Sequence, residues 1–416
     1  MINSGVVPQL GQAMVPGTLS DVSALAAGYY HSLALQSDGT VTAWGAGTAN
    51  TGVSPNYGQA MVPAAASNTI ALAAGSYHSL ALRADGTLMA WGAGTNNTGV
   101  SPHYGQAMIP PGLSDVAAVA AGGYHSLALR ADGTVAGWGA GSVNTGVTPN
   151  YGQAMVPEAL SNVVMIAAGG YHSLALLADG TLAAWGDNTY GQTNVPTGLT
   201  NVASIAAGRY FSLALKSDGT VVGWGNDTYG QADTPNSLAN VVGIAGGGFH
   251  DLALENGGQP YVTAQPFSRT VHAGADVRFT ALAAGIQPLT YQWRCNGADI
   301  PGATNAWLDL ANVQADRVGS YWVVVNNLLG TASSATAVLA IKGVVTTPYI
   351  DSLKCLPNGT FRLQVSGGPG MFEIEAAPQL SGWTRLSTVT AAGPVFQYTD
   401  PNTNQAGRFY RVRLLP

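Results

Sequence analysis

The hydrophobic pattern of this chain repeats six times before residue 257. Its clearest form is AAGSYHSLAL at Ala73–Leu82, in which apolar side chains alternate with small or polar ones. Such alternation is typical of a β-strand that buries one face. The copies are 47 residues apart for the first three intervals and 39 for the last two. A period of this length indicates an architecture built from one supersecondary unit per repeat.

Each repeat predicts short antiparallel strands joined by tight turns. In the second copy, TIALAAG, YHSLALR and TLMAWG alternate as three strands, and GQAMVP before them predicts a short extended fourth strand. Asp-Gly separates the second and third strands and is a strong hairpin signal, because both residues tolerate positive φ. Four short strands in a unit of about forty residues predict the blade of a β-propeller. The pairs recur as Asp-Gly at Asp38, Asp85, Asp132, Asp179 and Asp218 and as Trp-Gly at Trp44, Trp91, Trp138, Trp185 and Trp224.

The order of the turns predicts a propeller with two different faces. Successive turns of a meander lie at opposite ends of its strands, so the glycine-aromatic turn and the loop after Trp-Gly share one face. The Asp-Gly turn lies on the other face. The loop after Trp-Gly has eight more residues in the first three repeats, as at Ala46–Gln59, than at Asp187–Gln192, and a partial copy, INSGVVPQLGQ, begins at Ile2. We therefore expect one face to carry the aromatic turns together with four enlarged loops.

An aromatic residue occupies the same turn in all six copies. It either packs on the next blade and plugs the channel, or it belongs to a binding surface. Each ring offers about 150–250 Å², so six partly exposed rings would form a patch of a size that is usually functional. Tyr29 and Arg209 vary beside the fixed aromatic, which favours a role in specificity. The candidate binding residues are Tyr29, Tyr30, Tyr77, Tyr124, Tyr171, Arg209, Tyr210 and Phe249.

Histidines follow the aromatic in five repeats, and the remaining repeat substitutes Phe211 without other change. Their repetition before a buried strand favours a structural role. Imidazoles spread around a ring are too far apart for one metal, whose nitrogen ligands lie at about 2.0–2.1 Å. The chain also has no phosphate-binding loop and no specific set of nucleophile, base and acid. We therefore expect no catalytic residue, no metal site, no cofactor and no enzyme activity. The five are His31, His78, His125, His172 and His250.

Charge excludes one class of partner. Only 9% of the residues are charged, and residues 1–257 carry four basic and 13 acidic residues, a net charge of −9. Nucleic-acid binding depends on phosphate neutralisation by Lys and Arg, so we expect no such partner. We expect no membrane insertion, because no apolar run is long enough to span a bilayer. No secretion signal is visible after Met1, so either a signal was removed or the protein stays inside the cell. Two cysteines, Cys295 and Cys355, are too few for a disulfide framework.

The segment Trp185–Gly225, WGDNTYGQTNVPTGLTNVASIAAGRYFSLALKSDGTVVGWG, resembles a repeat of the regulator-of-chromosome-condensation family. Trp-Gly, Gly-Gln, Val-Pro, Ala-Gly and His-Ser-Leu landmarks carry the resemblance over residues 1–257. The short blades are most similar to the bacterial branch that includes type II β-lactamase-inhibitory protein. The family implies a closed propeller, often of seven blades. The landmarks here predict six visible blades, with closure by an N-terminal strand, or seven if blades are missing upstream.

Two small β-sandwich domains are expected after the propeller, at residues 258–343 and 344–416. The first resembles a bacterial immunoglobulin-like domain, with Trp293 as the core tryptophan and Tyr321 at the tyrosine corner. Ala281 and Val323 take the places of the paired cysteines. The second resembles small modules of secreted bacterial proteins, through SGWTRL and RFYRVRL. Its last strand carries three arginines that we expect on a solvated face, Arg408, Arg411 and Arg413.

These features predict an all-β, noncatalytic recognition protein of secreted or cell-surface bacterial type. Its propeller would bind a protein partner through the aromatic, loop-bearing face, and the sandwich domains would serve as a stalk. In the inhibitory relatives, loops on one propeller face grip a target enzyme. Inhibition of an extracellular enzyme such as a β-lactamase is therefore one alternative. An extracellular glycan as the partner, or a polysaccharide-active enzyme, is another. The sequence leaves the oligomeric state open.

Overall fold

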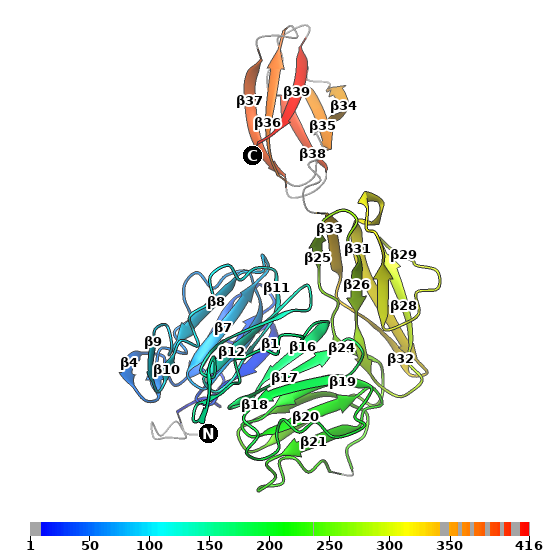
Figure 1. Cartoon of the computed structure of the whole chain (residues 1–416). Helices are drawn as coiled ribbons and strands as arrows, with labels where there is room; N and C mark the ends of the chain where they lie inside the picture. The colour runs from blue at the N-terminus through cyan, green and yellow to red at the C-terminus, as the bar shows by residue number, and fades with distance from the viewer. Residues whose placement is uncertain are drawn as a thin grey trace. The chain divides into compact units, whose positions relative to one another are not determined.

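The computed structural model is almost entirely β (Figure 1). It describes residues 10–235, 237–341, 349–356, 360–366, 370–378, 383–391, 395–400 and 408–415. The chain divides into two compact units, Met1–Ala340 and Ile341–Pro416. The first unit holds a series of repeated sheets followed by a β-sandwich, and the second holds a smaller pair of sheets. The predicted all-β class is therefore confirmed.

Five of the repeats form three-stranded antiparallel sheets, each in the order first, second and third strand. We call them blades one to five, and they follow one another along the chain (Figure 1). A sixth unit, blade six, has two strands. The strands are β1 (Val22–Ala27), β2 (His31–Gln36) and β3 (Val41–Gly45); β6 (Thr69–Ala74), β7 (His78–Arg83) and β8 (Leu88–Gly92); β11 (Val116–Ala121), β12 (His125–Arg130) and β13 (Val135–Gly139); β16 (Val163–Ala168), β17 (His172–Leu177) and β18 (Leu182–Gly186); β19 (Val202–Ala207), β20 (Phe211–Lys216) and β21 (Val221–Gly225); and β22 (Val241–Gly246) and β23 (Asp251–Glu255).

The predicted fourth strand of each blade is wrong. In the GQAMVP segment of the second repeat, the Gln59 carbonyl accepts hydrogen bonds from Trp91 Nε1 at 2.9 Å and from Ser79 Oγ at 2.8 Å. The Gln59 side chain accepts one from the Tyr57 amide and donates one to the Pro55 carbonyl. The hydrogen bonds of this segment thus join it to side chains and to its own loop, and not to a strand ladder.

The blades pack closely because glycine stands at each Ala-Gly turn. A Cβ on Gly75 would lie 2.5 Å from the Gly122 carbonyl oxygen of the next blade and 2.3 Å from the ring of His78. Backbone hydrogen bonds also cross between blades here, as from the Arg209 amide to the Gly247 carbonyl at 3.1 Å. The Leu-Ala-Leu segment of the second strand in each three-stranded blade is only 0–4% exposed. These contacts place the turns of successive blades side by side.

Blades one and six cover each other less than the internal blades do. Leu25 on β1 is 71% exposed, whereas Ile205 at the same place in blade five is buried. Leu252 on β23 is 64% exposed, whereas its counterpart Leu213 is 0% exposed. We call this boundary the seam. The predicted closing strand lies outside the described residues, and the possibility of a seventh blade stays a prediction.

Three of the enlarged loops form small two-stranded hairpins. Gly47, which has a φ of 81°, is required beside the buried side chain of Gln59, because a Cβ there would lie 2.1 Å from Gln59 Oε1. The fourth enlarged loop, INSGVVPQLGQ, lies almost wholly outside the described residues. The hairpins are β4 (Asn50–Val53) with β5 (Asn56–Tyr57), β9 (Asn97–Val100) with β10 (His103–Tyr104), and β14 (Asn144–Val147) with β15 (Asn150–Tyr151).

The β-sandwich of the first unit buries the predicted core residues. Trp293 stacks on Phe279 with ring centroids 6.2 Å apart, and Phe279 stacks on Tyr321 at 5.1 Å. Tyr321 Oη donates a hydrogen bond of 2.6 Å to the Arg317 carbonyl, as a tyrosine corner requires. Ala281 and Val323 are fully buried, and Cys295 is free. The strands are β24 (Tyr261–Ala264), β25 (Arg269–Val271), β26 (Val277–Thr280), β27 (Leu282–Ala284), β28 (Thr290–Cys295), β29 (Ala298–Asp299), β30 (Trp307–Leu310), β31 (Gly319–Asn327), β32 (Gly330–Ser333) and β33 (Ala337–Ile341).

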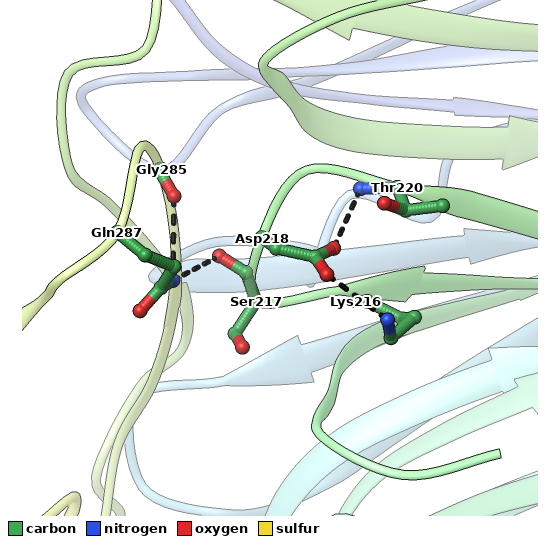
Figure 2. A network of polar contacts seen from close by, with 6 residues as sticks. All are labelled: Lys216, Ser217, Asp218, Thr220, Gly285 and Gln287. Carbon is green, nitrogen blue, oxygen red and sulfur yellow. Dashed lines mark hydrogen bonds and ion pairs between the residues drawn. The ribbon is translucent and has the colours of Figure 1, made fainter. Parts of the chain in front are cut away.

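The sandwich contacts the Asp-Gly end of blade five (Figure 2). Gln287 Nε2 donates a hydrogen bond of 2.7 Å to the Ser217 carbonyl, and the Gly285 amide donates one of 3.2 Å to the same oxygen. Beside it, Lys216 Nζ and Asp218 Oδ2 form an ion pair at 2.9 Å, which fixes the hairpin turn. These contacts lie at the opposite end of the blade from its aromatic turn. They therefore leave the aromatic face of blade five open.

The second unit contains two three-stranded sheets around Leu363, Val365 and Ile374. The expectation of a solvated arginine face is wrong for Arg408, whose side chain is 15% exposed, whereas that of Arg411 is 41% exposed. Arg408 forms an ion pair of 2.5 Å with the buried Asp400, and Arg411 forms two hydrogen bonds to Glu375. Only part of SGWTRL lies within the described residues. The strands are β34 (Tyr349–Cys355), β35 (Phe361–Ser366), β36 (Gly370–Ala377), β37 (Thr384–Ala391), β38 (Val395–Asp400) and β39 (Phe409–Leu414).

Candidate functional site, an aromatic funnel

The glycine-aromatic turns of all six blades surround one cavity of about 570 Å³. Their convergence on a single cavity shows that the blades are arranged around a shared axis. We call this cavity the aromatic funnel. Tyr210 lies just behind the lining, with its ring stacked on Tyr171 at 5.8 Å. The other candidate binding residues line the funnel directly: Tyr29, Tyr30, Tyr77, Tyr124, Tyr171, Arg209 and Phe249.

The rings of the turn aromatics pack on one another along the blades. The ring centroid of Tyr77 lies 5.1 Å from that of Tyr30 and 5.9 Å from that of Tyr124. Tyr124 and Tyr171 are stacked at 5.9 Å. Every turn aromatic therefore packs on another aromatic ring, and all of them except Tyr210 also line the funnel. Phe249 is the most exposed of the six, at 47%.

A second ring of tyrosines surrounds the first and was not predicted from the sequence. Each of these tyrosines lies in the loop after a Trp-Gly strand and contacts the turn aromatic of the next blade, as Tyr57 contacts Tyr77 with centroids 5.5 Å apart. The signal is in the sequence, because Tyr stands two residues before Gln in five of the Gly-Gln landmarks. The contacts also place these loops on the face of the aromatic turns. The residues are Tyr57, Tyr104, Tyr151, Tyr190 and Tyr229.

Loop length decides how far this outer ring is exposed. Tyr57 lies under the long loop that follows blade one and is 9% exposed. Tyr229, in the short loop after blade five, is 73% exposed. Residues of the long loops also hydrogen-bond tyrosines, as Thr148 Oγ1 does with Tyr151 Oη at 2.7 Å. The funnel is therefore walled along blades one to three and open along blades four to six.

Arg209 lies at the open side of the funnel, among three aromatic rings. Its guanidinium carbon is 5.1 Å from the ring centroid of Tyr210, 5.6 Å from that of Tyr29 and 5.8 Å from that of Phe249. These distances are within the range of cation–π interactions. Arg209 also hydrogen-bonds the side chain of Tyr171, whose pKa burial raises to about 12. The aromatic rings thus hold the cation in place at the funnel wall.

Four histidines form hydrogen bonds that link each blade to the next. Ser79 Oγ donates its proton to the Gln59 carbonyl, so it accepts the 2.8 Å hydrogen bond from His31 Nε2. The imidazole is therefore the Nε2–H tautomer, and its Nδ1 is a buried acceptor without a partner. The same pattern links His78 to Ser126, His125 to Ser173 and His172 to Ser212.

Burial keeps these imidazoles neutral. It lowers the pKa to about 4 for His31 and His172 and to about 3 for His78 and His125. His250 in blade six is exposed. The buried histidines thus have a structural role, as the sequence predicted.

The series ends with a paired exchange between blades five and six. Phe211 replaces the fifth histidine, and Asp251 stands where the next blade would offer the accepting serine. The expectation that Phe211 appears without other change is therefore wrong, because the serine that would pair with a histidine here is replaced by Asp251 in the following repeat.

The part of the chain that the structure describes contains no group of side chains suited to hold a metal ion and no helix long and apolar enough to cross a membrane. Five segments match the regulator of chromosome condensation (RCC1) repeat: residues 22–51, 70–98, 116–144, 163–192 and 202–231. Each match begins in or next to the first strand of a blade and ends in the loop after its Trp-Gly strand. The repeats are thus RCC1-type β-repeats.

Several solved structures of immunoglobulin domains are also similar. An I-band fragment of titin is 18% identical, with 37% of this chain and 64% of that chain covered at a TM-score of 0.20. A twitchin kinase fragment from C. elegans is 19% identical, with 22% and 23% covered at 0.20. Sidekick-1 immunoglobulin domains are 16% identical, with 38% and 34% covered at 0.24. The chain spans less than two thirds of the length of each.

Proposed function

We propose that this chain is a noncatalytic recognition protein whose aromatic funnel binds a protein partner. The observation that carries the proposal is the two rings of aromatic side chains around one cavity, exposed at blades five and six. Tyr229 and Phe249 contact each other there with ring centroids 5.6 Å apart, and both expose much of their surface. Aromatic residues and arginine dominate the energetic centres of protein interfaces. RCC1-type repeats are typically protein-interaction modules, which agrees with this role.

Binding is a better use of this site than catalysis. The histidines nearest the turns are buried, neutral and bonded to structural serines. The one exposed member of the series, His250, borders the funnel. Among the described residues that line the funnel there is no carboxylate to orient it as a general base. A concave, mostly apolar cavity with few polar groups instead has the character of a binding pocket.

We also propose an extracellular or cell-surface location in a bacterium, with the sandwich domains as a stalk. The first sandwich attaches at the Asp-Gly end of blade five, through Ser217 and Gln287, and so leaves the aromatic turn of that blade accessible. A propeller that is attached through its Asp-Gly face can present its aromatic face to a partner outside the cell.

Inhibition of an extracellular enzyme such as a β-lactamase is the second candidate function. The long-loop wall along blades one to three favours it, because a walled concave site fits a protruding loop of a folded partner. The resemblance to the inhibitory branch, seen in the short blades of residues 185–225, points the same way. An assay of β-lactamase turnover with excess protein tests this version directly.

The proposed function is tested by alanine substitution of Tyr229, combined with Tyr190, in the full chain. Peptides selected from a displayed library for binding to the wild-type protein are the probes, and affinity is measured by biolayer interferometry. We expect the double variant to bind at least tenfold more weakly, because tyrosine is enriched among the few interface residues whose truncation costs over about 1 kcal/mol. Tyr261→Ala removes a comparably exposed ring from the sandwich and is the matched control. Unchanged affinity in the double variant contradicts the proposal.

A further inference from the structure

Arg209 differs from the other basic residues of the propeller in its surroundings. Residues 1–257 contain three others, Arg83, Arg130 and Lys216, and each precedes an Asp-Gly turn. Lys216 is paired with Asp218, Arg83 donates to the Ala65 carbonyl, and Arg130 donates to Thr134 Oγ1 at 3.4 Å. Arg209 alone among the four lines the aromatic funnel. Its position in an aromatic turn requires a separate explanation.

The guanidinium of Arg209 has hydrogen-bond donors to spare. Its guanidinium carbon lies 5.1–5.8 Å from the centroids of three rings, and rings do not use its N–H groups as a carboxylate would. The side chain of Tyr171 takes one hydrogen bond. A guanidinium carries five N–H donors in a rigid fork that matches the two oxygens of a carboxylate. The arrangement positions a cation and leaves part of its fork for a ligand.

Nothing among the described residues neutralises this cation. Arg209 is in none of their ion pairs, and no Asp or Glu lines the funnel. Residues 1–257 nevertheless carry a net charge of −9, so acidic side chains are abundant elsewhere on the propeller. An anionic group would be repelled by most of this domain and attracted at the funnel. It would therefore bind at the funnel and not elsewhere on the propeller.

We propose that the group which enters the aromatic funnel is a carboxylate of a peptide segment, bound by the Arg209 fork. This inference rests on the proposed function and names the chemistry of the partner. The cavity of about 570 Å³ has room for a few side chains, and its walls are mainly aromatic rings and glycine. A sugar would bury many hydroxyl groups against walls with few side-chain acceptors, which is unfavourable. An acidic residue flanked by apolar ones matches the surface better.

The carboxylate has two sources in a peptide, an Asp or Glu side chain and the free C-terminus. Two displayed libraries distinguish them. In the first the peptide is fused through its C-terminus, so only side chains supply the group. In the second the peptide ends in a free carboxylate. Both are selected on the full chain, and only peptides whose binding falls in Tyr229→Ala are kept as ligands of this face.

Synthetic versions of the selected peptides then test the pairing with Arg209. We expect replacement of the acid by Gln or Asn, or amidation of the C-terminus, to weaken binding at least tenfold. Arg209→Gln should weaken binding of the acidic peptide by a similar factor and leave binding of the neutral peptide unchanged. The effects of Arg209→Gln and of neutralising the peptide acid are then not additive. Arg209→Lys keeps the charge but lacks the two-pronged guanidinium. Its affinity for the acidic peptide should lie between those of the wild type and Arg209→Gln. Arg130→Gln removes the same charge away from the funnel and should bind like the wild type.

The outcomes separate this inference from the proposed function. Peptides that require Tyr229 but bind equally as acid and amide overturn the carboxylate and leave the recognition role intact. Acidic peptides that bind Arg209→Gln as tightly as the wild type, with both proteins folded by circular dichroism, also overturn it. A selection that yields no peptide sensitive to Tyr229→Ala overturns both proposals.

Discussion

At the scale of single residues, the hydrogen bond of each repeat serine determines the protonation state of a histidine. Ser126 Oγ donates to the Gln106 carbonyl and so requires an Nε2–H from His78, which leaves His78 Nδ1 as an unbonded acceptor. A second proton on that imidazole would place an unpaired charge in the core. The same argument holds for each of the four buried histidines.

The first prediction is that the propeller loses stability in mild acid. The folded pKa values of about 3 to 4 lie below the unfolded value of about 6.5, so the unfolded chain takes up protons first as the pH falls. The free energy of unfolding therefore decreases from about pH 6.5 until the folded histidines titrate near pH 3 to 4. At pH 5 the loss is about 2 kcal/mol for each such histidine. Urea unfolding at pH 7 and pH 5 measures it.

His125→Phe is the matched variant, because Phe211 already fills the same position in blade five. It should fold at pH 7 and lose about 2 kcal/mol less between pH 7 and pH 5 than the wild type does. An unchanged pH dependence in this variant would show that His125 is not a source of the acid sensitivity.

The aromatic residues show what the sequence can predict at this scale. Tyr77 and its equivalents were found because a fixed place in a short repeat predicts a fixed place in space. The exposure of a given ring was not predictable, because it depends on a loop from the preceding blade. The partners of Arg209 were also hidden, since Tyr29 and Phe249 come from the two ends of the repeat array and meet only in the folded ring.

At the scale of elements, the long and the short loops both provide hydrogen-bond partners for the same buried glutamine. In the short loop, Gln192 Oε1 accepts the Tyr190 amide and Gln192 Nε2 donates to Asp187. In the long loop, Gln153 Oε1 accepts the Tyr151 amide and Nε2 donates to the Pro149 carbonyl. The glutamine is satisfied in both, so the eight extra residues are not needed to complete the blade.

The second prediction follows from this equivalence. Replacing Ala140–Gln153 with the sequence of Asp187–Gln192 should leave the free energy of unfolding within about 1 kcal/mol of the wild type, since the buried glutamine keeps both partners. It should also expose the ring of Tyr171, which the long loop helps to cover. Nitration of Tyr171 by tetranitromethane, followed by mass spectrometry, should become faster. A large loss of stability, or no gain in reactivity, contradicts the prediction.

The failed fourth strand has a cause at the same scale. GQAMVP has the composition of a short edge strand, but its Gln carbonyl is used by the Trp and Ser side chains of the blade that follows. Sequence periodicity reports which residues face the core. It does not report that a side chain of another repeat replaces a strand as the hydrogen-bond partner.

At the scale of the whole molecule, the repeat predicted the radial arrangement but not the seam. Every internal blade covers the second strand of its neighbour, so a reader of the sequence assigns the same burial to all six copies of the Leu-Ala-Leu pattern. The copy in β23 breaks this rule, since Leu252 and Leu254 are both exposed. The same Leu-Ala-Leu sequence is thus buried within the array and exposed at its end, so its contribution to the free energy of unfolding depends on its position.

The last prediction compares the same substitution at the seam and within the array. Leu213→Ala removes a fully buried side chain between blades and should lower the free energy of unfolding by about 2–5 kcal/mol. Leu252→Ala removes a side chain that is already exposed and should lower it by less than about 1 kcal/mol, because little apolar area leaves the core. The measurement is the urea midpoint of the full chain, with unchanged dependence on urea as the check that the same unit unfolds. If Leu252→Ala is as destabilising as Leu213→Ala, the seam is covered in solution and the ring is closed more tightly than these contacts indicate.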